Sequence, residues 1–241
     1  VYSYFLQTTT EGFTVIQING LNKSLFGGGH RVNILNGIDL VIPSGQFIAI
    51  TGASGSGKTT LLSLIAGLDE PTEGNIIING QNITKFSEDE LAELRSQHFG
   101  FVFQNFNLIP TLTALENVTL SAELNGSNGT QKKSTELLSL VGLANRNHHY
   151  PSQLSGGEQQ RLSLARAFIN EPSIVLADEP TGNLDSENSK RILDLMSDLH
   201  RNKKSTIALV THEPDVANKA ERIIVMDDGK IVQDSLPALE K

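Results

Sequence analysis

Short apolar runs rich in β-branched residues recur in the first and last thirds of the chain, bounded by Gly, Pro and Asp. Runs of this length and composition are typical of strands. Helical patterns follow two of them, at Lys58–Ala66 and Ser186–His200. The alternation of strand and helix predicts crossover connections and a largely parallel sheet. The predicted strands are Phe13–Ile18, Ile38–Ile42, Phe47–Thr51, Ile76–Ile78, Ile174–Ala177, Ile207–Thr211, Ile223–Met226 and Ile231–Val232.

The middle of the chain, about residues 88–168, has helical patterns instead. A polar stretch of Gly, Asn and Ser at Asn125–Thr130 predicts a loop between two of these helices. We therefore expect one α/β domain over residues 1–241, with a core of about residues 13–87 and 169–234 and a helical insertion between them. The helices expected in the insertion are Asp89–Ser96, Ala114–Leu124, Thr130–Val141 and Gly156–Ile169.

The composition narrows the functional classes. The 241 residues include 27 acidic and 19 basic side chains, which give a formal charge of −8. This charge disfavours nucleic acid as the main partner, because phosphate backbones are bound by basic surfaces. The chain has no Cys, which excludes disulfides and thiolate chemistry. No apolar run approaches the roughly 20 residues of a membrane-spanning helix. We expect an acidic globular protein of the cytoplasm.

A glycine-rich loop follows the predicted strand Phe47–Thr51 and opens the helix at Lys58. It fits the P-loop pattern G-x-x-x-x-G-K-[ST], in which glycines let successive N–H groups turn inward around phosphates. The helix N-terminus adds its dipole. Lys58 would bridge the β- and γ-phosphates of a nucleotide during catalysis, and the Thr59 hydroxyl would be a ligand of Mg²⁺. The residues expected to bind the nucleotide are Gly52, Ala53, Ser54, Gly55, Ser56, Gly57, Lys58, Thr59 and Thr60.

Two carboxylates end the apolar strand Ile174–Ala177. Parallel strands inside an α/β sheet are buried on both faces, so their first polar residues lie at the carboxyl edge, where ligands bind. Asp178 is therefore a candidate for the Mg²⁺ shell. Glu179, the next residue, is a candidate base that polarises the water attacking a γ-phosphate.

The segment Leu154–Arg161, LSGGEQQR, resembles the signature sequence of ABC-type ATPases. It lies between the phosphate loop and the acidic strand, as in that family. Three further residues match the family in order: Gln104 in the Q-loop, Asp185 in the D-loop, and His212 as the switch histidine. The resemblance covers about residues 14–232.

Finer matches indicate a subgroup. The segments TALENV at 113–118 and ADEPTGNLD at 177–185 look like those of lipoprotein-releasing (LolD), macrolide-exporting (MacB) and YbbA-type ATP-binding proteins. The segment FVFQ at 101–104 looks closest to the YbbA type. The resemblance implies a P-loop NTPase core with a mostly parallel sheet, an antiparallel β subdomain and a helical insertion.

The family resemblance also assigns roles to residues. It implies that Gln104 contacts Mg²⁺ and the attacking water, that His212 contacts the γ-phosphate, and that Asp185 lies at the nucleotide. Ser155, Gly156 and Gly157 would form a second phosphate site, because a helix N-terminus presents free N–H groups. In the family this site serves the nucleotide of a second copy, in a head-to-tail homodimer around two ATP.

One position departs from the family. Most members place an aromatic residue near position 25 to stack on adenine, whereas this chain has Leu25 followed by Phe26. The preference for adenine over guanine is therefore an open question in the sequence.

The sequence predicts a Mg²⁺-dependent ATPase subunit of an ABC transport or mechanotransmission complex, a homodimer driving a separate permease at the inner face of the membrane. DNA-repair members carry long coiled-coil or zinc insertions, and translation-factor members carry two cassettes; neither feature occurs here. The alternative is a nucleotide-gated interaction or regulatory ABC ATPase that is not coupled to transport.

Overall fold

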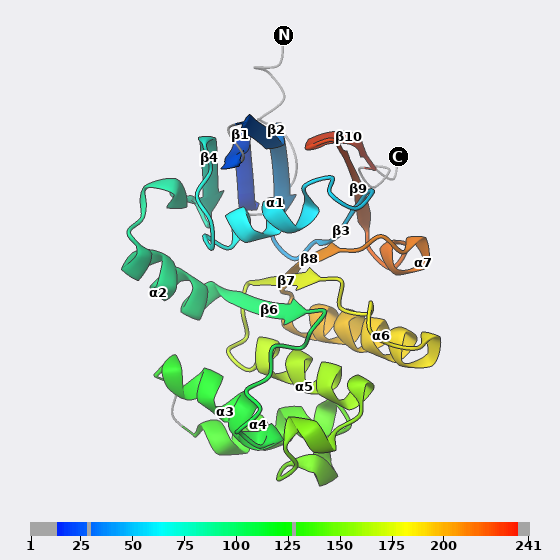
Figure 1. Cartoon of the computed structure of the whole chain (residues 1–241). Helices are drawn as coiled ribbons and strands as arrows, with labels where there is room; N and C mark the ends of the chain where they lie inside the picture. Colours follow the sequence, from blue (N-terminus) through cyan, green and yellow to red (C-terminus); the bar gives the residue numbers. More distant parts are fainter. Residues whose placement is uncertain (1–13, 28–29, 127–128, 236–241) are drawn as a thin grey trace, which may run out of the picture.

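The computed structural model describes residues 14–27, 30–126 and 129–235. Within these residues a six-stranded sheet has the order β10-β9-β3-β8-β7-β6 (Figure 1). All neighbouring pairs are parallel except β10 with β9. The strands are β3 (Phe47–Thr51), β6 (Phe99–Phe103), β7 (Ile174–Asp178), β8 (Thr206–Val210), β9 (Arg222–Asp227) and β10 (Lys230–Asp234).

A second sheet is antiparallel and has the order β2-β1-β4-β5 in the described chain. Its strands are β1 (Thr14–Gly27), β2 (His30–Pro43), β4 (Glu73–Ile78) and β5 (Gln81–Asn82). The two sheets together confirm the expected fold class of a mostly parallel core with an antiparallel β subdomain. Both strands of the β1–β2 hairpin are longer than the apolar runs at residues 13–18 and 38–42, because their outer halves, which mix polar and apolar residues, pair through the backbone.

Helices connect the strands and cover the central sheet. They are α1 (Lys58–Ile65), α2 (Glu88–His98), α3 (Ala114–Leu124), α4 (Thr130–Leu140), α5 (Gly156–Phe168), α6 (Ser186–Lys203) and α7 (Pro214–Ala217), with 3₁₀ turns at Ile83–Lys85, Ala144–Arg146 and Pro151–Gln153. Reciprocal capping boxes fix the starts of α2, α3 and α5, where a Ser or Thr and the Glu three residues later satisfy each other's backbone N–H groups. No helix in the described ranges combines the length and apolarity that crossing a bilayer requires.

Each face of the central sheet packs against its own hydrophobic core. Along β7 the side chains alternate: Ile174 and Leu176 enter the core beneath α1 and the antiparallel sheet, whereas Val175 and Ala177 enter the core formed with α3 to α6. Figure 1 shows α1 and the antiparallel sheet on one side of the central strands, and α5 and α6 on the other. This double burial explains the continuous apolar run of β7.

Only helices were predicted between residues 88 and 168, so strand β6 was not expected from the sequence. It pairs in parallel with β7, and Phe103 lies opposite Asp178. Neighbouring rings along β6 stack, with centroids 6.0 Å apart for Phe99 and Phe101 and 5.9 Å for Phe101 and Phe103. The strand contains a glycine because a Cβ at Gly100 would lie 2.4 Å from the Ala167 carbonyl oxygen of α5. Its formation brings the residue after Phe103 to the carboxyl edge of the sheet.

Candidate functional site: the carboxyl edge of the central sheet

The loop between β3 and α1 has a backbone that only glycine can adopt at two places. Gly52 has φ 143° and Gly57 has φ 98°. A Cβ at Gly52 would lie 2.1 Å from the Met226 carbonyl oxygen, and one at Gly57 would lie 2.7 Å from Leu35 Cδ2. The loop is therefore pressed against β9 and β2, and these contacts restrict its curvature.

Lys58 lies inside this loop. Its ammonium donates hydrogen bonds to the carbonyl oxygens of Gly52 (2.8 Å) and Ala53 (2.7 Å) and lies 3.4 Å from Ser56 Oγ. These three oxygens match the three donors of an ammonium group, and the side chain is buried. The loop thus concentrates a positive charge at its centre, where phosphate oxygens could exchange with the loop's own acceptors.

The first turn of α1 adds backbone donors to this charge. The N–H groups at the start of a helix have no intrahelical acceptor, and the helix dipole favours an anion there. Thr59 is exposed and Thr60 is half-buried in this turn, while Ala53, Ser54 and Gly55 form the exposed crown of the loop. The residues of the predicted P-loop, 52–60, therefore lie together at the N-terminus of α1.

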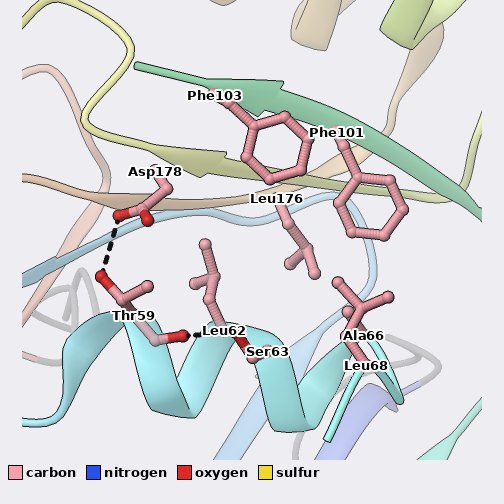
Figure 2. A pocket seen from close by; sticks show the side chains of 9 residues that line it. All are labelled: Thr59, Leu62, Ser63, Ala66, Leu68, Phe101, Phe103, Leu176 and Asp178. Atoms are coloured by element: carbon pink, nitrogen blue, oxygen red, sulfur yellow. Dashed lines mark hydrogen bonds between the residues drawn. The ribbon is translucent and has the colours of Figure 1, made fainter. Parts of the chain in front are cut away.

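Asp178 approaches the same turn from the end of β7. The Thr59 hydroxyl donates to Asp178 Oδ1 at 3.3 Å, as Figure 2 shows. Burial raises the pKa of the Asp178 carboxyl, and the Thr59 hydrogen bond acts against this shift. A carboxylate beside a hydroxyl at a phosphate site is the oxygen donor set that Mg²⁺ prefers, so the residues present fit this ion.

Glu179 occupies a strained backbone conformation. Its φ is 45°, in the left-handed region, and it precedes Pro180, which disfavours helical conformations in the residue before it. Such an outlier costs about 1–3 kcal/mol and persists only where neighbouring contacts enforce it. Glu179 N donates to the Val210 carbonyl at 2.9 Å, and Gly182 N donates to the Glu179 carbonyl at 3.1 Å.

The turn aims the Glu179 carboxylate at His212, which follows β8. Glu179 Oε1 lies 3.0 Å from His212 Nδ1, within hydrogen-bond distance. Strands β7 and β8 are neighbours, with Asp178 opposite Val210, so this contact follows from the strand register. The structure thus brings the predicted base and the predicted switch histidine together.

Gln104 reaches the same edge through β6. Its side chain lies over the loop after Glu179: Gln104 Nε2 is 3.5 Å from Asn183 Oδ1, and Asn183 Nδ2 donates to the Gln104 carbonyl at 3.0 Å. Gly182 faces this amide, because a Cβ there would lie 2.7 Å from Gln104 Nε2. In the described residues no hydrogen bond joins Gln104 to Thr59 or Asp178, so its role as a metal ligand stays a prediction.

The signature segment forms the start of α5. Ser155 caps the helix: its Oγ accepts from Glu158 N at 3.3 Å, and Ser155 N donates to Glu158 Oε2 at 2.8 Å. The Ser155 N–H and the Arg146 guanidinium lower the pKa of Glu158 to about 2, so the capping carboxylate is ionised at physiological pH. Gly156 is exposed at this end of the helix.

Asp185 has a structural partner in the same region. It caps α6, where Asn188 N donates to Asp185 Oδ1 at 2.8 Å and this bond lowers the pKa of the carboxyl. Gly157 packs against Asn188, since a Cβ there would lie 2.5 Å from Asn188 Oδ1. Within the described chain no hydrogen bond links Ser155 or Asp185 to the phosphate loop. One chain therefore presents two separate candidate phosphate sites.

The β1–β2 hairpin presents an apolar surface where the adenine contact was expected. Leu25 lies opposite Val32, and both side chains are 52% exposed. Phe26 is 84% exposed and lies opposite Arg31. Successive side chains of a strand point to opposite faces, so Leu25 and Phe26 lie on different sides of the hairpin, and the contact of Leu25 with adenine stays a prediction.

Sequence reasoning missed one residue that contacts this edge. Gln160 of α5 donates to the Pro180 carbonyl at 2.6 Å and lies 3.5 Å from the Phe103 carbonyl. A glutamine within an amphipathic helix gives no local signal for such a contact, since both acceptors are distant in the sequence. Its place in the signature segment was the only feature of the sequence that pointed to it.

Comparisons with known proteins agree with this geometry. The family model described as "ABC transporter" matches residues 35–182. The chain is 46% identical over 225 residues to the macrolide export ATP-binding/permease protein MacB of Rhodopirellula baltica, covering 91% of this chain and 33% of MacB. The chain therefore spans about a third of the length of the MacB relatives. It is 44% identical over 223 residues to the uncharacterized ABC transporter ATP-binding protein YbbA of Escherichia coli K12, covering 92% of this chain and 98% of YbbA.

A solved structure has the same fold. The ATP-binding cassette MJ0796, as a dimer in a post-hydrolysis state bound to ADP and Pi, superposes with a TM-score of 0.85 at 40% identity, covering 91% of this chain and 97% of that chain. A further dimeric structure of MJ0796 gives the same TM-score at 41% identity. The expected family, fold and ATPase activity are confirmed, and the chain belongs to the ABC transporter family as an ATP-binding, ATP-hydrolysing cassette.

Proposed function

We propose that two copies of this chain close around two MgATP and that their hydrolysis drives a separate membrane permease. The observation that carries the catalytic part is the convergence of β3, β7 and β8 at one edge, which groups Lys58, Thr59, Asp178, Glu179 and His212. These residues bring a positive charge for the phosphates, oxygen donors for a cation and a carboxylate base to the same edge of the sheet.

Each residue has a distinct task in this proposal. Lys58 and the α1 N-terminus hold the β- and γ-phosphates, and Thr59 and Asp178 hold Mg²⁺, which when bound neutralises charge on the phosphate oxygens. The Glu179 carboxylate accepts a proton from water as the water oxygen bonds to the γ-phosphorus and the bond to the β-phosphate oxygen breaks. His212 orients Glu179 through the 3.0 Å contact.

The second phosphate site supports a dimer. Ser155 and Gly156 are exposed at the N-terminal end of α5, with Gly157 buried behind them, and no hydrogen bond of the described chain joins these residues to its own P-loop. A head-to-tail pair with C₂ symmetry would place this cap against the γ-phosphate held by the other copy. The dimeric state of MJ0796 agrees with this arrangement.

Phosphate release by the purified chain tests the need for the cation. We expect steady-state release from ATP in MgCl₂ and none above background when EDTA removes divalent ions, because Thr59 and Asp178 then lack the cation that they hold at the phosphates. Restoring MgCl₂ in excess should restore the rate. Equal rates in both buffers would contradict the assignment of Thr59 and Asp178 as metal ligands.

The permease contact is assigned to a groove between the central sheet and the helical insertion. This groove has a volume of about 500 Å³. Its apolar wall comprises Leu68, Ile109, Leu120 and Leu124, and Arg95 and Arg166 contribute positive charge. An apolar helix face with an acidic residue would complement this lining. Because the chain has no helix suited to a membrane in its described part, such a contact would hold it at the inner face of the membrane.

From sequence alone, the apolar residues of the loop-like stretch after Gln104 would be expected to line the permease groove; these are Phe106, Leu108, Ile109 and Leu112. Of these, only Ile109 lines the groove of about 500 Å³. Leu108 packs against the core formed with α3 to α6, and Arg166 binds the Phe106 carbonyl at 2.9 Å. Leu108 thus packs on the core of the insertion, whereas Leu120 and Leu124 of α3 line the groove.

Leu124→Glu is expected to release the protein from membranes of the native cell while leaving its basal ATPase rate unchanged. Leu124 is 77% exposed, so a carboxylate there is tolerated by the fold but opposes burial against a partner. Leu140→Glu is the matched control, because Leu140 is 57% exposed on α4 and lies outside the groove lining. Membrane flotation measures retention. Retention of the Leu124 variant at the level of the Leu140 control would overturn the assignment of the groove.

A further inference from the structure

Gln160 is a polar side chain at the centre of the fold. It lies in the second turn of α5 and its side chain is fully buried, with 0% relative exposure. Its amide nitrogen donates to the Pro180 carbonyl at 2.6 Å and approaches the Phe103 carbonyl at 3.5 Å. One amide group thus joins the signature helix to the ends of β6 and β7.

Both acceptors adjoin catalytic candidates. Pro180 directly follows Glu179, and Phe103 directly precedes Gln104. The strand register places Phe103 opposite Asp178, so the two carbonyls belong to neighbouring chain segments as they leave the sheet. Gln160 therefore fixes the spacing between these segments from beneath the site.

The contact is significant because the Glu179 turn is strained. With φ at 45° before a proline, this backbone requires external restraint. The N–H of Glu179 is held by the Val210 carbonyl and its carbonyl by the Gly182 N–H. The Gln160 bond to the Pro180 carbonyl restrains the next peptide group, which completes three successive anchors around the catalytic carboxylate.

The amide also carries an unpaired group. Among the described residues, Gln160 Oε1 is buried and has no hydrogen-bond partner. Flipping the amide would place this oxygen against the Pro180 carbonyl, so the observed orientation is the favourable one. A buried unpaired acceptor destabilises a fold. An apolar side chain of the same size would remove this acceptor but would leave the Pro180 carbonyl unpaired instead. Stability is therefore nearly the same with either side chain, and what distinguishes glutamine at this position is its restraint on the Pro180 peptide.

We propose that Gln160 is a positioning residue for ATP hydrolysis, which holds the Pro180 peptide so that the strained Glu179 carboxylate faces the attacking water. The proposal rests on the proposed role of Glu179 as the base. Gln160 itself touches neither nucleotide nor water, so its loss should alter the rate of the chemical step and leave nucleotide binding at the P-loop intact.

Gln160→Met tests this directly. Methionine keeps the length and volume of the side chain but cannot donate a hydrogen bond. We expect kcat to fall about 10- to 100-fold, the range for misplacing a catalytic group by about an ångström, with KM and the Kd for ATP unchanged. Thermal stability should change little, because the variant exchanges one buried unpaired acceptor, Gln160 Oε1, for another, the Pro180 carbonyl.

The matched control is Asn170→Leu. Asn170 lies before the start of β7, at the end of the strand opposite Asp178, and its amide donates to the Ser121 carbonyl at 3.0 Å while its Oδ1 is unpaired in the described chain. Its replacement removes the same kind of amide–carbonyl bond away from the catalytic loops and should leave kcat unchanged. Gln160→Asn, which keeps an amide one methylene shorter, should lose kcat as the methionine variant does. It carries the test if circular dichroism shows the methionine variant unfolded.

Three results would overturn the inference: a wild-type kcat in the Gln160 variants, an equal loss of kcat in the Asn170 control, or a loss confined to ATP affinity. Glu179→Gln measured alongside separates this from the proposed function. If Glu179→Gln is inactive while the Gln160 variants are active, the positioning role alone fails. If Glu179→Gln retains its turnover, the assignment of the base fails.

Discussion

Replacing Glu179 by glutamine is expected to lower the turnover of ATP by a factor of roughly 10²–10⁴, the contribution of general-base catalysis. Glutamine has nearly the same shape but cannot accept a proton from water. The groups that hold the phosphates, Lys58 and the N-terminus of α1, are unchanged. Affinity for ATP should therefore stay at the wild-type level, so that kcat falls without a rise in KM.

Steady-state phosphate release and equilibrium binding of ATP measure the two quantities for Glu179→Gln. Glu187→Gln is a suitable control, because Glu187 is an exposed carboxylate in the first turn of α6 that pairs with Arg191. It should keep full turnover. A Glu179→Gln variant that hydrolyses ATP at the rate of this control would show that another group takes the proton.

The second large effect is expected for Lys58→Ala, which should weaken ATP binding by at least about a hundredfold. A charge-assisted hydrogen bond contributes about 1.5–3 kcal/mol, and each 1.4 kcal/mol is a factor of ten in affinity. Lys58 would supply two such bonds, one to each of the β- and γ-phosphates. The protein is acidic overall, so little other positive charge compensates for the loss.

Titration calorimetry with ATP measures the loss, and Lys85→Ala provides the control, because Lys85 is an exposed cation remote in sequence from the loop. Lys58 also binds the carbonyls of Gly52 and Ala53, so circular dichroism must show that the variant is folded. Wild-type affinity in a folded Lys58→Ala protein would contradict the assignment of the phosphate site.

The residues that could be placed from sequence are those whose signal is local. The glycines of the P-loop and the acids that follow the apolar run of β7 can each be recognised from the residues next to them in the sequence. The contact between Glu179 and His212 also follows once β7 and β8 are recognised as neighbouring parallel strands. The motifs and the strand pattern together were sufficient to predict which residues meet at this edge of the sheet.

Features that depend on distant partners were missed or misplaced. Strand β6 pairs with β7, which lies about 70 residues further along the chain and which no local window contains. Its phenylalanines at alternate positions are a local strand signal that was not used. Leu108 looked exposed because its neighbours are loop-like, yet it packs on the second core. Gln160 is distinguished only by two carbonyls brought to it by folding.

The central claim is that the signature cap of one copy completes the nucleotide site of another. Ser155 begins α5 at solvent, and its replacement by arginine would put a bulky side chain where the partner's γ-phosphate should lie. The Glu179→Gln background removes turnover, so a closed dimer should persist in MgATP. Glu179→Gln/Ser152→Arg is the control, because Ser152 is exposed on the preceding 3₁₀ turn, outside the cap.

The decisive measurement is the molar mass by light scattering, after size-exclusion chromatography in saturating MgATP. The account predicts a dimer for Glu179→Gln and for the Ser152 control, and a monomer that still binds ATP for Glu179→Gln/Ser155→Arg. A monomeric Glu179→Gln protein, or a dimer that survives Ser155→Arg, would contradict the shared nucleotide site.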